Sequence, residues 1–299
     1  MFKLLHGKFI IANLMQPDGD TIRFKPDNVG FVEELRRGSP GSPINNRGVN
    51  IRLEAVDALE KNQELEGATA ARDELLRMLG FTGVRFSGNP PFTVNSGNQE
   101  VSGYVLSNGF DSFGTRLVGF VYSGDGSVRG SNGSDIPLDE DLVDESVNTA
   151  LLSEGYVFPA FYDTLPGNIR EHLATKSKAA RRANKGVWPR SKGFPGDPLI
   201  LETPILASLR EAVLWPKLYR RLESFLKSGQ PKTLDGFEDW LQEDPQSRDD
   251  GILLIRSDPP KSVRLHDVVE VSGNSVELKF WPEDFIVQGH PTNTNGSQS

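Results

Sequence analysis

The order of strand-like and helix-like segments in residues 1–188 limits the possible folds more than any other feature of the sequence. A strand candidate at 7–14 is followed by alternating apolar and polar residues at 21–26 and 49–57. An Asp-Gly pair at 18–19, typical of a tight turn, joins the first two segments into a hairpin. Helical patterns occur at 68–80, 144–155 and 167–185. Because strands come first and helices mostly later, we expect an α+β, mainly β fold, a small β-barrel with helices packed on it.

The composition changes after residue 188. Proline, glycine and serine concentrate in 189–198, which is typical of a linker. We therefore expect a first domain at 1–189, a linker at 190–198 and a second domain at 199–288. A helical pattern interrupted by Pro216, and then strand patterns that include a hairpin over 261–281 with its turn around 272–275, predict that the second domain is small and α+β. The polar stretch at 289–299 is expected to be a disordered tail.

The cysteine and histidine content excludes several kinds of active site. The chain of 299 residues has no cysteine and four histidines, and no two of these histidines have the spacing of metal ligands. Disulfide partners, a thiol nucleophile and cysteine-bound zinc or iron–sulfur groups are therefore excluded. Any metal should be a hard cation bound by oxygen atoms.

Charge and hydropathy bear on possible partners. The formal net charge of −8 argues against non-specific electrostatic adhesion to nucleic acid, although a local basic site is still possible. No apolar run approaches the roughly 18–20 residues of a membrane span. The N-terminal segment lacks the continuous apolar region of a signal peptide. We therefore expect a cytoplasmic protein with no membrane partner.

Charged residues recur around the first three predicted strands. Asp18 and Asp20 flank the hairpin turn, Arg52 lies on the third strand, and Asp57 and Glu60 follow near its end. Each is ordinary alone, since Asp-Gly is a common turn and exposed carboxylates or arginines are usually solvated. In combination they place two acidic pairs and an arginine at neighbouring strand ends.

This combination resembles the staphylococcal nuclease (thermonuclease-like) family. The family's D-G-D-T turn stands at 18–21, and its R-x-x-x-x-D-x-P-E string stands at 52–60, where Leu59 replaces the proline. The D-x-Y-G-R string stands at 111–116, with Thr115 inserted before Arg116.

The end of the family's domain is also represented, by VNTALLSEG at 147–155 and by REHL at 170–173, which leads to Trp188. The resemblance extends over residues 5–188, with longer loops at 28–48 and 88–110. It implies an OB-type five-stranded Greek-key β-barrel with three helices. It says nothing about residues 190–299.

The resemblance also implies a calcium site. Asp20, Asp57 and the backbone carbonyl of Ala58 would bind Ca²⁺, which takes oxygen ligands. Asp18 would stabilise the turn that carries Asp20 without binding the ion itself. Such a cation offsets the negative charge that grows on a phosphodiester as water attacks it.

The remaining implied roles concern the nucleic acid and the attacking water. Arg52 and Arg116 would bind non-bridging phosphate oxygens through paired hydrogen bonds, and Glu60 would position or deprotonate the water. Phe113 takes the place of the tyrosine in D-x-Y-G-R, and Phe161 stands where the family has a stacking tyrosine. Both would stack on bases without sequence preference.

The sequence therefore predicts a calcium-dependent nuclease, a phosphodiesterase that hydrolyses DNA and/or RNA. The alternative is a non-catalytic OB-type module that binds nucleic acid or protein. Retention of the charged residues favours the enzyme, because a module that only binds would be free to lose them. A third alternative is that the accessory domain caps or inhibits the site, or binds an unknown partner that regulates it.

Overall fold

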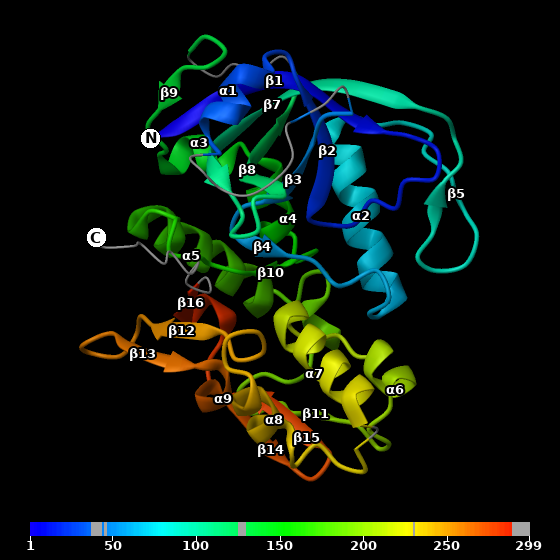
Figure 1. Cartoon of the computed structure of the whole chain (residues 1–299), viewed down its shortest axis with the longest axis vertical. Coiled ribbons are helices and arrows are strands. Elements are labelled where there is room, and N and C mark those ends of the chain that lie inside the picture. The colour runs from blue at the N-terminus through cyan, green and yellow to red at the C-terminus, as the bar shows by residue number, and fades with distance from the viewer. Residues whose placement is uncertain (37–43, 45–46, 125–129, 230, 289–299) are drawn as a thin grey trace, which may run out of the picture.

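The first strands of the chain close into a barrel (Figure 1). The structure, a computed structural model, describes residues 1–36, 44, 47–124, 130–229 and 231–288. The predicted disordered tail at 289–299 lies outside the described residues. The barrel strands are β1 (Phe2–Ile11), β2 (Thr21–Pro26), β3 (Val49–Leu53), β7 (Gln99–Phe110) and β8 (Arg116–Ser123).

The barrel strands pair in the order β1-β2-β3-β8-β7, and β7 returns to pair with β1. The pair β3–β8 is parallel and the other pairs are antiparallel, so the barrel is mixed. A short strand, β9 (Asp135–Ile136), extends the sheet at β1. The expected α+β fold with a five-stranded barrel is therefore confirmed.

Alternation explains the barrel's core. Along β2 and β3, every second side chain points inward, and Ile22, Phe24, Ile51 and Leu53 are buried. Such period-2 burial gives each strand one apolar face for the core. The predicted strand at 21–26 agrees with β2 at both ends.

Helices pack against the outside of the barrel strands. The first three are α1 (Val29–Glu34), α2 (Leu65–Leu79) and α3 (Glu140–Asp144), and the next two are α4 (Val147–Ser153) and α5 (Gly167–Arg182). Helix α1 packs on β1, and helices α2 and α4 pack on β8. The helix predicted at 68–80 begins three residues earlier, because the Glu64 side chain accepts a hydrogen bond from the Gly67 N–H. It ends as expected at Gly80, whose φ of 98° suits glycine.

Short strand pairs complete this part of the chain. β4 (Val56–Asp57) pairs with β10 (Phe158–Pro159), and β5 (Phe86–Ser87) pairs with β6 (Thr93–Val94). The pairing β4–β10 brings the end of the β3–β4 segment to the side of the barrel that faces the C-terminal part (Figure 1).

The C-terminal part contains two three-stranded sheets and several helices. The sheets have the orders β11-β15-β14 and β13-β12-β16. The elements before β13 are η1 (Trp188–Arg190), β11 (Leu199–Ile200), α6 (Leu206–Arg210), α7 (Pro216–Gly229), α8 (Phe237–Glu243) and β12 (Gly251–Leu254). The rest are β13 (Lys261–Arg264), α9 (Leu265–Val268), β14 (Val269–Ser272), β15 (Ser275–Leu278), η2 (Pro282–Asp284) and β16 (Phe285–Gln288).

Two local predictions for the C-terminal part meet different outcomes. Pro216 separates two helices as expected, and it is the first residue of α7, where its missing N–H costs nothing. The hairpin around 272–275 is confirmed, with Val271 opposite Val276. Its expected extension back to residue 261 is wrong, because 261–264 pair with β12 and 265–268 form the helical turn α9.

The two parts of the chain share one apolar cluster. Leu59, Phe158 and Trp188 from the first part pack with the C-terminal core, which includes Trp215 and Leu222. The residues predicted as a linker also join this cluster. Phe194 is buried, and its ring stacks on Trp281 at 5.2 Å between centroids. The barrel and the C-terminal part are therefore packed together rather than connected only by the chain.

None of the helices within the described residues is both long and apolar enough to cross a membrane. This agrees with the absence of a long apolar run in the sequence.

A buried asparagine ties α4 to the barrel, and its loss should be costly. The Asn148 side-chain nitrogen donates to the carbonyls of Glu54 and Gly119 at 2.9 and 3.1 Å, and its oxygen accepts from the Val121 N–H at 3.0 Å. Asn148→Ala removes the side-chain partner of the Val121 N–H and of the Glu54 carbonyl, whereas the Gly119 carbonyl keeps a hydrogen bond from the Glu54 N–H at 2.9 Å. We therefore expect a loss of about 2–3 kcal/mol in unfolding free energy, measured by urea denaturation.

The matched control is Asn98→Ala, because the Asn98 side chain accepts a single exposed hydrogen bond from the Asn13 N–H. This variant should change the unfolding free energy by less than about 1 kcal/mol. Equal effects of the two substitutions would contradict the role assigned to Asn148.

Candidate active site

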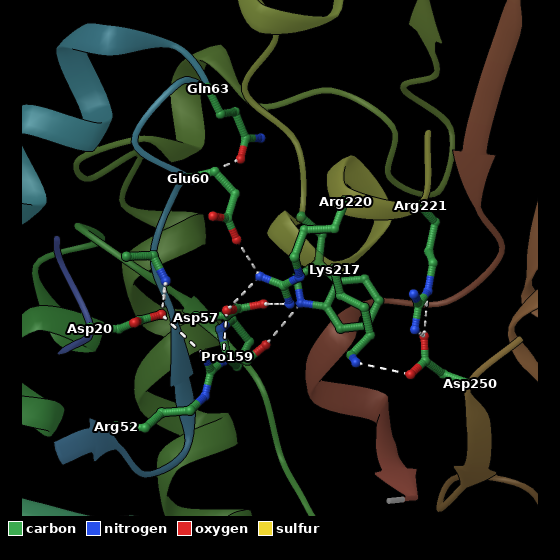
Figure 2. A network of polar contacts seen from close by, with 12 residues as sticks. Asp20, Arg52, Asp57, Glu60, Gln63, Pro159, Lys217, Arg220, Arg221 and Asp250 are labelled. Carbon is green, nitrogen blue, oxygen red and sulfur yellow. Dashed lines mark hydrogen bonds and ion pairs between the residues drawn. The ribbon is translucent and has the colours of Figure 1, made fainter. Parts of the chain in front are cut away.

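The predicted site residues of the first strands meet at one corner of the barrel. Arg52 lies on the outward face of β3, opposite Thr21 on β2, and Asp57 ends the short strand β4. The Arg52 Nη2 donates to Asp57 Oδ1 at 2.8 Å, and its Nη1 lies 3.9 Å from Asp20 Oδ2 (Figure 2). The structure therefore brings Asp20, from the turn before β2, next to Arg52 and Asp57, which lie five residues apart in the chain.

The turn before β2 holds Asp20 in place. Its Oδ2 accepts a hydrogen bond from the Ala58 N–H at 3.0 Å, and its Oδ1 accepts one from the Thr21 hydroxyl at 2.9 Å. Gly19 is required here, because a Cβ at this position would lie 2.6 Å from the Cβ of Ala71 and 2.8 Å from that of Ala58. The D-G-D-T turn thus fits closely between the residues after β4 and helix α2.

An arginine from the C-terminal part enters the same corner. Arg220, on α7, donates from Nη2 to Asp57 Oδ2 at 2.8 Å and from Nη1 to Asp57 Oδ1 at 3.2 Å. Its Nη1 also donates to Glu60 Oε1 at 2.6 Å (Figure 2). The sequence analysis missed this residue, since no motif distinguishes it and 163 positions separate it from Asp57.

The charges of this cluster support one another. Burial alone would raise the pKa of Asp57, but Arg220 and Arg52 outweigh it and hold that pKa far below its usual range. Burial likewise opposes the charge on Arg52, yet Asp20 and Asp57 raise its pKa well above the usual value. Asp57 therefore stays ionised and paired, although it is fully buried.

Glu60 differs from Asp57. Its carboxyl is partly exposed, and burial raises its pKa although Arg220 acts in the opposite direction. Gln63 accepts a hydrogen bond from the Glu60 N–H at 3.2 Å, and the Gln63 amide donates to the carbonyl of Leu214 in the C-terminal part. Glu60 is thus the more basic carboxylate of the pair that Arg220 contacts.

Asp18 lies behind this cluster, beside a small pocket that it lines with Lys61, Arg72 and Phe92. Burial and the nearby Asp20 raise the pKa of Asp18 to about 7, against the attraction of Lys61. The Lys61 Nζ lies 3.6 Å from one carboxylate oxygen, and the other oxygen is buried with no hydrogen-bond partner. The ion-pair partner of Asp18 among the described residues is thus Lys61, not Arg52.

Arg116 begins β8 on the same outward face as Arg52. It lies opposite Asn50 in the parallel pair β3–β8, two positions from Arg52. Its Nε donates to Asp111 Oδ2 at 3.0 Å, and about a third of the side chain is exposed. The extra Thr115 lies in the turn before β8, where its N–H donates to Asp111, and the register irregularity is in β7 between Ser107 and Gly109.

The two phenylalanines have different environments. Phe113 is 69% exposed at the tip of the β7–β8 turn. Phe161 is fully buried in the core of the barrel and presents no open ring face to a base, so the structure does not fit its expected stacking role. Tyr162, which the sequence analysis passed over, is half-buried, with its ring 5.9 Å from the Lys217 Nζ.

The carboxylates do not fit calcium in this arrangement. Both oxygens of Asp57 and one of Glu60 accept hydrogen bonds from guanidinium groups, and Asp20 Oδ2 accepts one from Ala58. Among the described residues, no group of three or more His, Cys, Asp or Glu side chains is arranged to hold a metal ion. Calcium binding through Asp20, Asp57 and Ala58 would therefore require Arg220 to leave.

No protein-family model matches the chain, and no curated protein matches it. Assignment to the thermonuclease-like family therefore stays a prediction from the motifs.

Proposed function

We propose that the barrel is a thermonuclease-like phosphodiesterase that hydrolyses DNA and/or RNA. The observation that carries the proposal is the meeting of Asp20, from the turn before β2, with Arg52, Asp57 and Glu60, from residues 52–60, at one corner of the barrel. Such residues in a chance surface cluster would be solvated and dispersed. Buried charges in specific pairs are typical of functional sites.

The topology supports an OB-type Greek-key barrel. The strand order β1-β2-β3-β8-β7, closed by β7–β1 and with one parallel pair at β3–β8, is compatible with a five-stranded barrel of that type. OB-type barrels commonly bind nucleic acid on the outward face of their strands. Arg52, Arg116 and the exposed ring of Phe113 belong to that face or its rim.

The proposed chemistry assigns each group a simple task. Arg52 and Arg116 donate paired hydrogen bonds to non-bridging phosphate oxygens and offset the charge that grows as water attacks. Glu60 accepts a proton from that water, which its raised pKa favours. The new P–O bond forms as the bond to the leaving oxygen breaks. Calcium dependence is part of the proposal only for a state in which Arg220 no longer contacts Asp57.

The second candidate is a non-catalytic module that binds nucleic acid or protein. Arg220 favours it, since this residue neutralises the two carboxylates that the reaction needs. In that case the charged corner joins the barrel to α7, and the barrel binds through Phe113 and Arg116 alone.

The assay measures degradation of single-stranded DNA and RNA with calcium and with a chelator. We expect cleavage that calcium stimulates and that Arg116→Ala lowers about a hundredfold, on the order of 3 kcal/mol of barrier. The melting temperature should change little, because Arg116 is partly exposed and its ion pair among the described residues is the one with Asp111.

Arg77→Ala is the control, since it removes an exposed arginine that pairs with Glu74 on α2. It should leave cleavage unchanged. Binding of nucleic acid without cleavage, both by the unmodified chain and by the Arg220→Met variant described below, would favour the second candidate instead.

A further inference from the structure

Arg220 stands where a cation would have to bind. Three hydrogen bonds of 2.6–3.2 Å join its guanidinium to both oxygens of Asp57 and to one of Glu60. Together with Arg52, these contacts leave no free oxygen on Asp57. A metal ion could approach this carboxylate only by displacing one of the two arginines.

The charge balance points to the same competition. The corner holds three carboxylates, Asp20, Asp57 and Glu60, and two guanidinium groups. Withdrawal of Arg220 would leave the carboxylates with Arg52 alone, an excess of negative charge that a divalent cation could neutralise. The Arg220 guanidinium and a divalent cation would therefore compete for the carboxylates of Asp57 and Glu60.

Helix α7 presents Arg220 from a fixed position. The Trp215 indole N–H, just before the helix, donates to the Pro159 carbonyl at 3.2 Å, and Tyr219 is buried. The next residue, Arg221, turns the other way and binds Asp250 in the C-terminal part at 2.8 and 3.0 Å (Figure 2). The two adjacent arginines thus bind different carboxylates, Arg220 that of Asp57 in the first part of the chain and Arg221 that of Asp250 in the C-terminal part.

We propose that Arg220 is an intramolecular cation that keeps divalent metal ions from Asp57 and Glu60. This rests on the proposed function, because it describes the structure as the closed state of the nuclease site. About a third of the Arg220 side chain is exposed, so the guanidinium has a route to solvent while α7 stays packed. The unmodified chain should therefore bind calcium weakly.

The test is a calcium titration of the full chain by calorimetry, with Arg220→Met as the main variant. Methionine keeps much of the length of arginine and removes the charge and the hydrogen bonds. We expect the variant to bind one calcium ion at least tenfold more tightly than the unmodified chain. The double variant Arg220→Met, Glu60→Gln should lose most of this gain, which locates the ion.

Arg221→Met is the matched control, because it removes the neighbouring arginine and an equally short ion pair on the same helix. Its calcium affinity should equal that of the unmodified chain. Calcium should also raise the melting temperature of Arg220→Met and not that of Arg221→Met.

Equal calcium affinity of Arg220→Met and the unmodified chain would overturn the proposal, as would equal gains from the two methionine variants. If Arg220→Met folds only with calcium present, the proposal is supported, since the ion then replaces the arginine. If it folds under neither condition, Arg220→Gln decides, because glutamine is neutral and still donates hydrogen bonds. A gain in affinity for this variant supports the competition, and no gain overturns it.

Cleavage separates this proposal from the proposed function. Tighter calcium binding by Arg220→Met without degradation of DNA or RNA would support the exclusion of metal and contradict the nuclease. Calcium-dependent cleavage by the unmodified chain that Arg220→Met does not increase would support the nuclease and contradict the exclusion.

Discussion

Asp57→Asn is expected to lower the free energy of unfolding by about 3–5 kcal/mol. Asp57 is fully buried and pairs with Arg52 and Arg220, both at 2.8 Å. Asparagine would leave Arg52 and Arg220 beside a neutral amide, with only Asp20 and Glu60 as their remaining ion-pair partners in the corner, and breaking a buried ion pair costs more than the intact pair contributes. Urea denaturation of the full chain measures the effect.

The sign of this effect tests the arrangement of the site. In an open metal site, carboxylates repel one another, so neutralising one of them commonly stabilises the protein. Here the carboxylate lies between two arginines, and neutralising it removes attraction instead. Stabilisation by Asp57→Asn, or a change below about 1 kcal/mol, would contradict the network that Arg220 completes.

The effect of Asp57→Asn on the free energy of unfolding should depend on pH. The pKa of Asp57 is held far below its usual range in the folded chain, so its stabilising contribution is complete above the unfolded value of about 3.9. That contribution is lost as the pH falls below this value. The difference in unfolding free energy between the unmodified chain and Asp57→Asn should therefore shrink in acid.

Asp197→Asn is the control for removal of an acid. Asp197 pairs with Lys192, and each of these side chains is about half exposed. Exposed pairs contribute little, so this substitution should change the unfolding free energy by less than about 1 kcal/mol.

Local signals in the sequence predicted many elements and some of the site. Alternation located β2, the glycine after α2 marked the end of that helix, and Pro216 marked the start of α7. These signals work because they depend on backbone geometry within a few residues. The motif spacing also placed Asp20, Arg52, Asp57 and Glu60 near one another, as the structure has them.

The sequence could not predict what depends on distant segments. Arg220 lies within a helix-forming segment and is one of two adjacent arginines. Only the packing of α7 decides which of the two faces Asp57. Phe161 and Tyr162 are neighbours with opposite environments, which a pattern match cannot distinguish in an irregular segment. Burial there follows from tertiary contacts, so the sequence alone could not show that the Phe161 ring is enclosed in the core.

The contact between the barrel and the C-terminal part also depends on segments far apart in the sequence, so the sequence did not predict it. Composition predicts a linker at 190–198, and the resemblance to the thermonuclease-like family ends at Trp188. In the structure the Trp188 ring packs against Phe158 at 4.9 Å and Phe194 at 5.7 Å. The Arg181 guanidinium lies 3.5 Å from the Trp281 ring centre and pairs with Glu283. The predicted boundary therefore falls inside a shared core.

A chain that ends after residue 189 should for this reason be much less stable than the full chain. It would expose Leu59, Phe158 and Trp188, which the C-terminal part covers. At about 1.5–3 kcal/mol for each large apolar side chain returned to water, the loss is about 5 kcal/mol or more. For a domain of this size that corresponds to a fall of roughly 10–20 °C in melting temperature.

Thermal unfolding and size-exclusion chromatography of residues 1–189 measure this, with residues 1–288 as the control. The control lacks only the tail and keeps every residue of the shared core, so it should melt at the same temperature as the full chain.

A monomeric 1–189 fragment that melts within a few degrees of the full chain would mean that the barrel is an independent domain. The packing around Trp188 would then contribute little, and the C-terminal part could leave the barrel without unfolding it. Melting well below the control, or aggregation through the exposed side chains, would instead mean that the barrel around the charged corner depends on both parts of the chain for its stability. Opening of the site would then depend on movement of the Arg220 side chain and not on release of the whole C-terminal part.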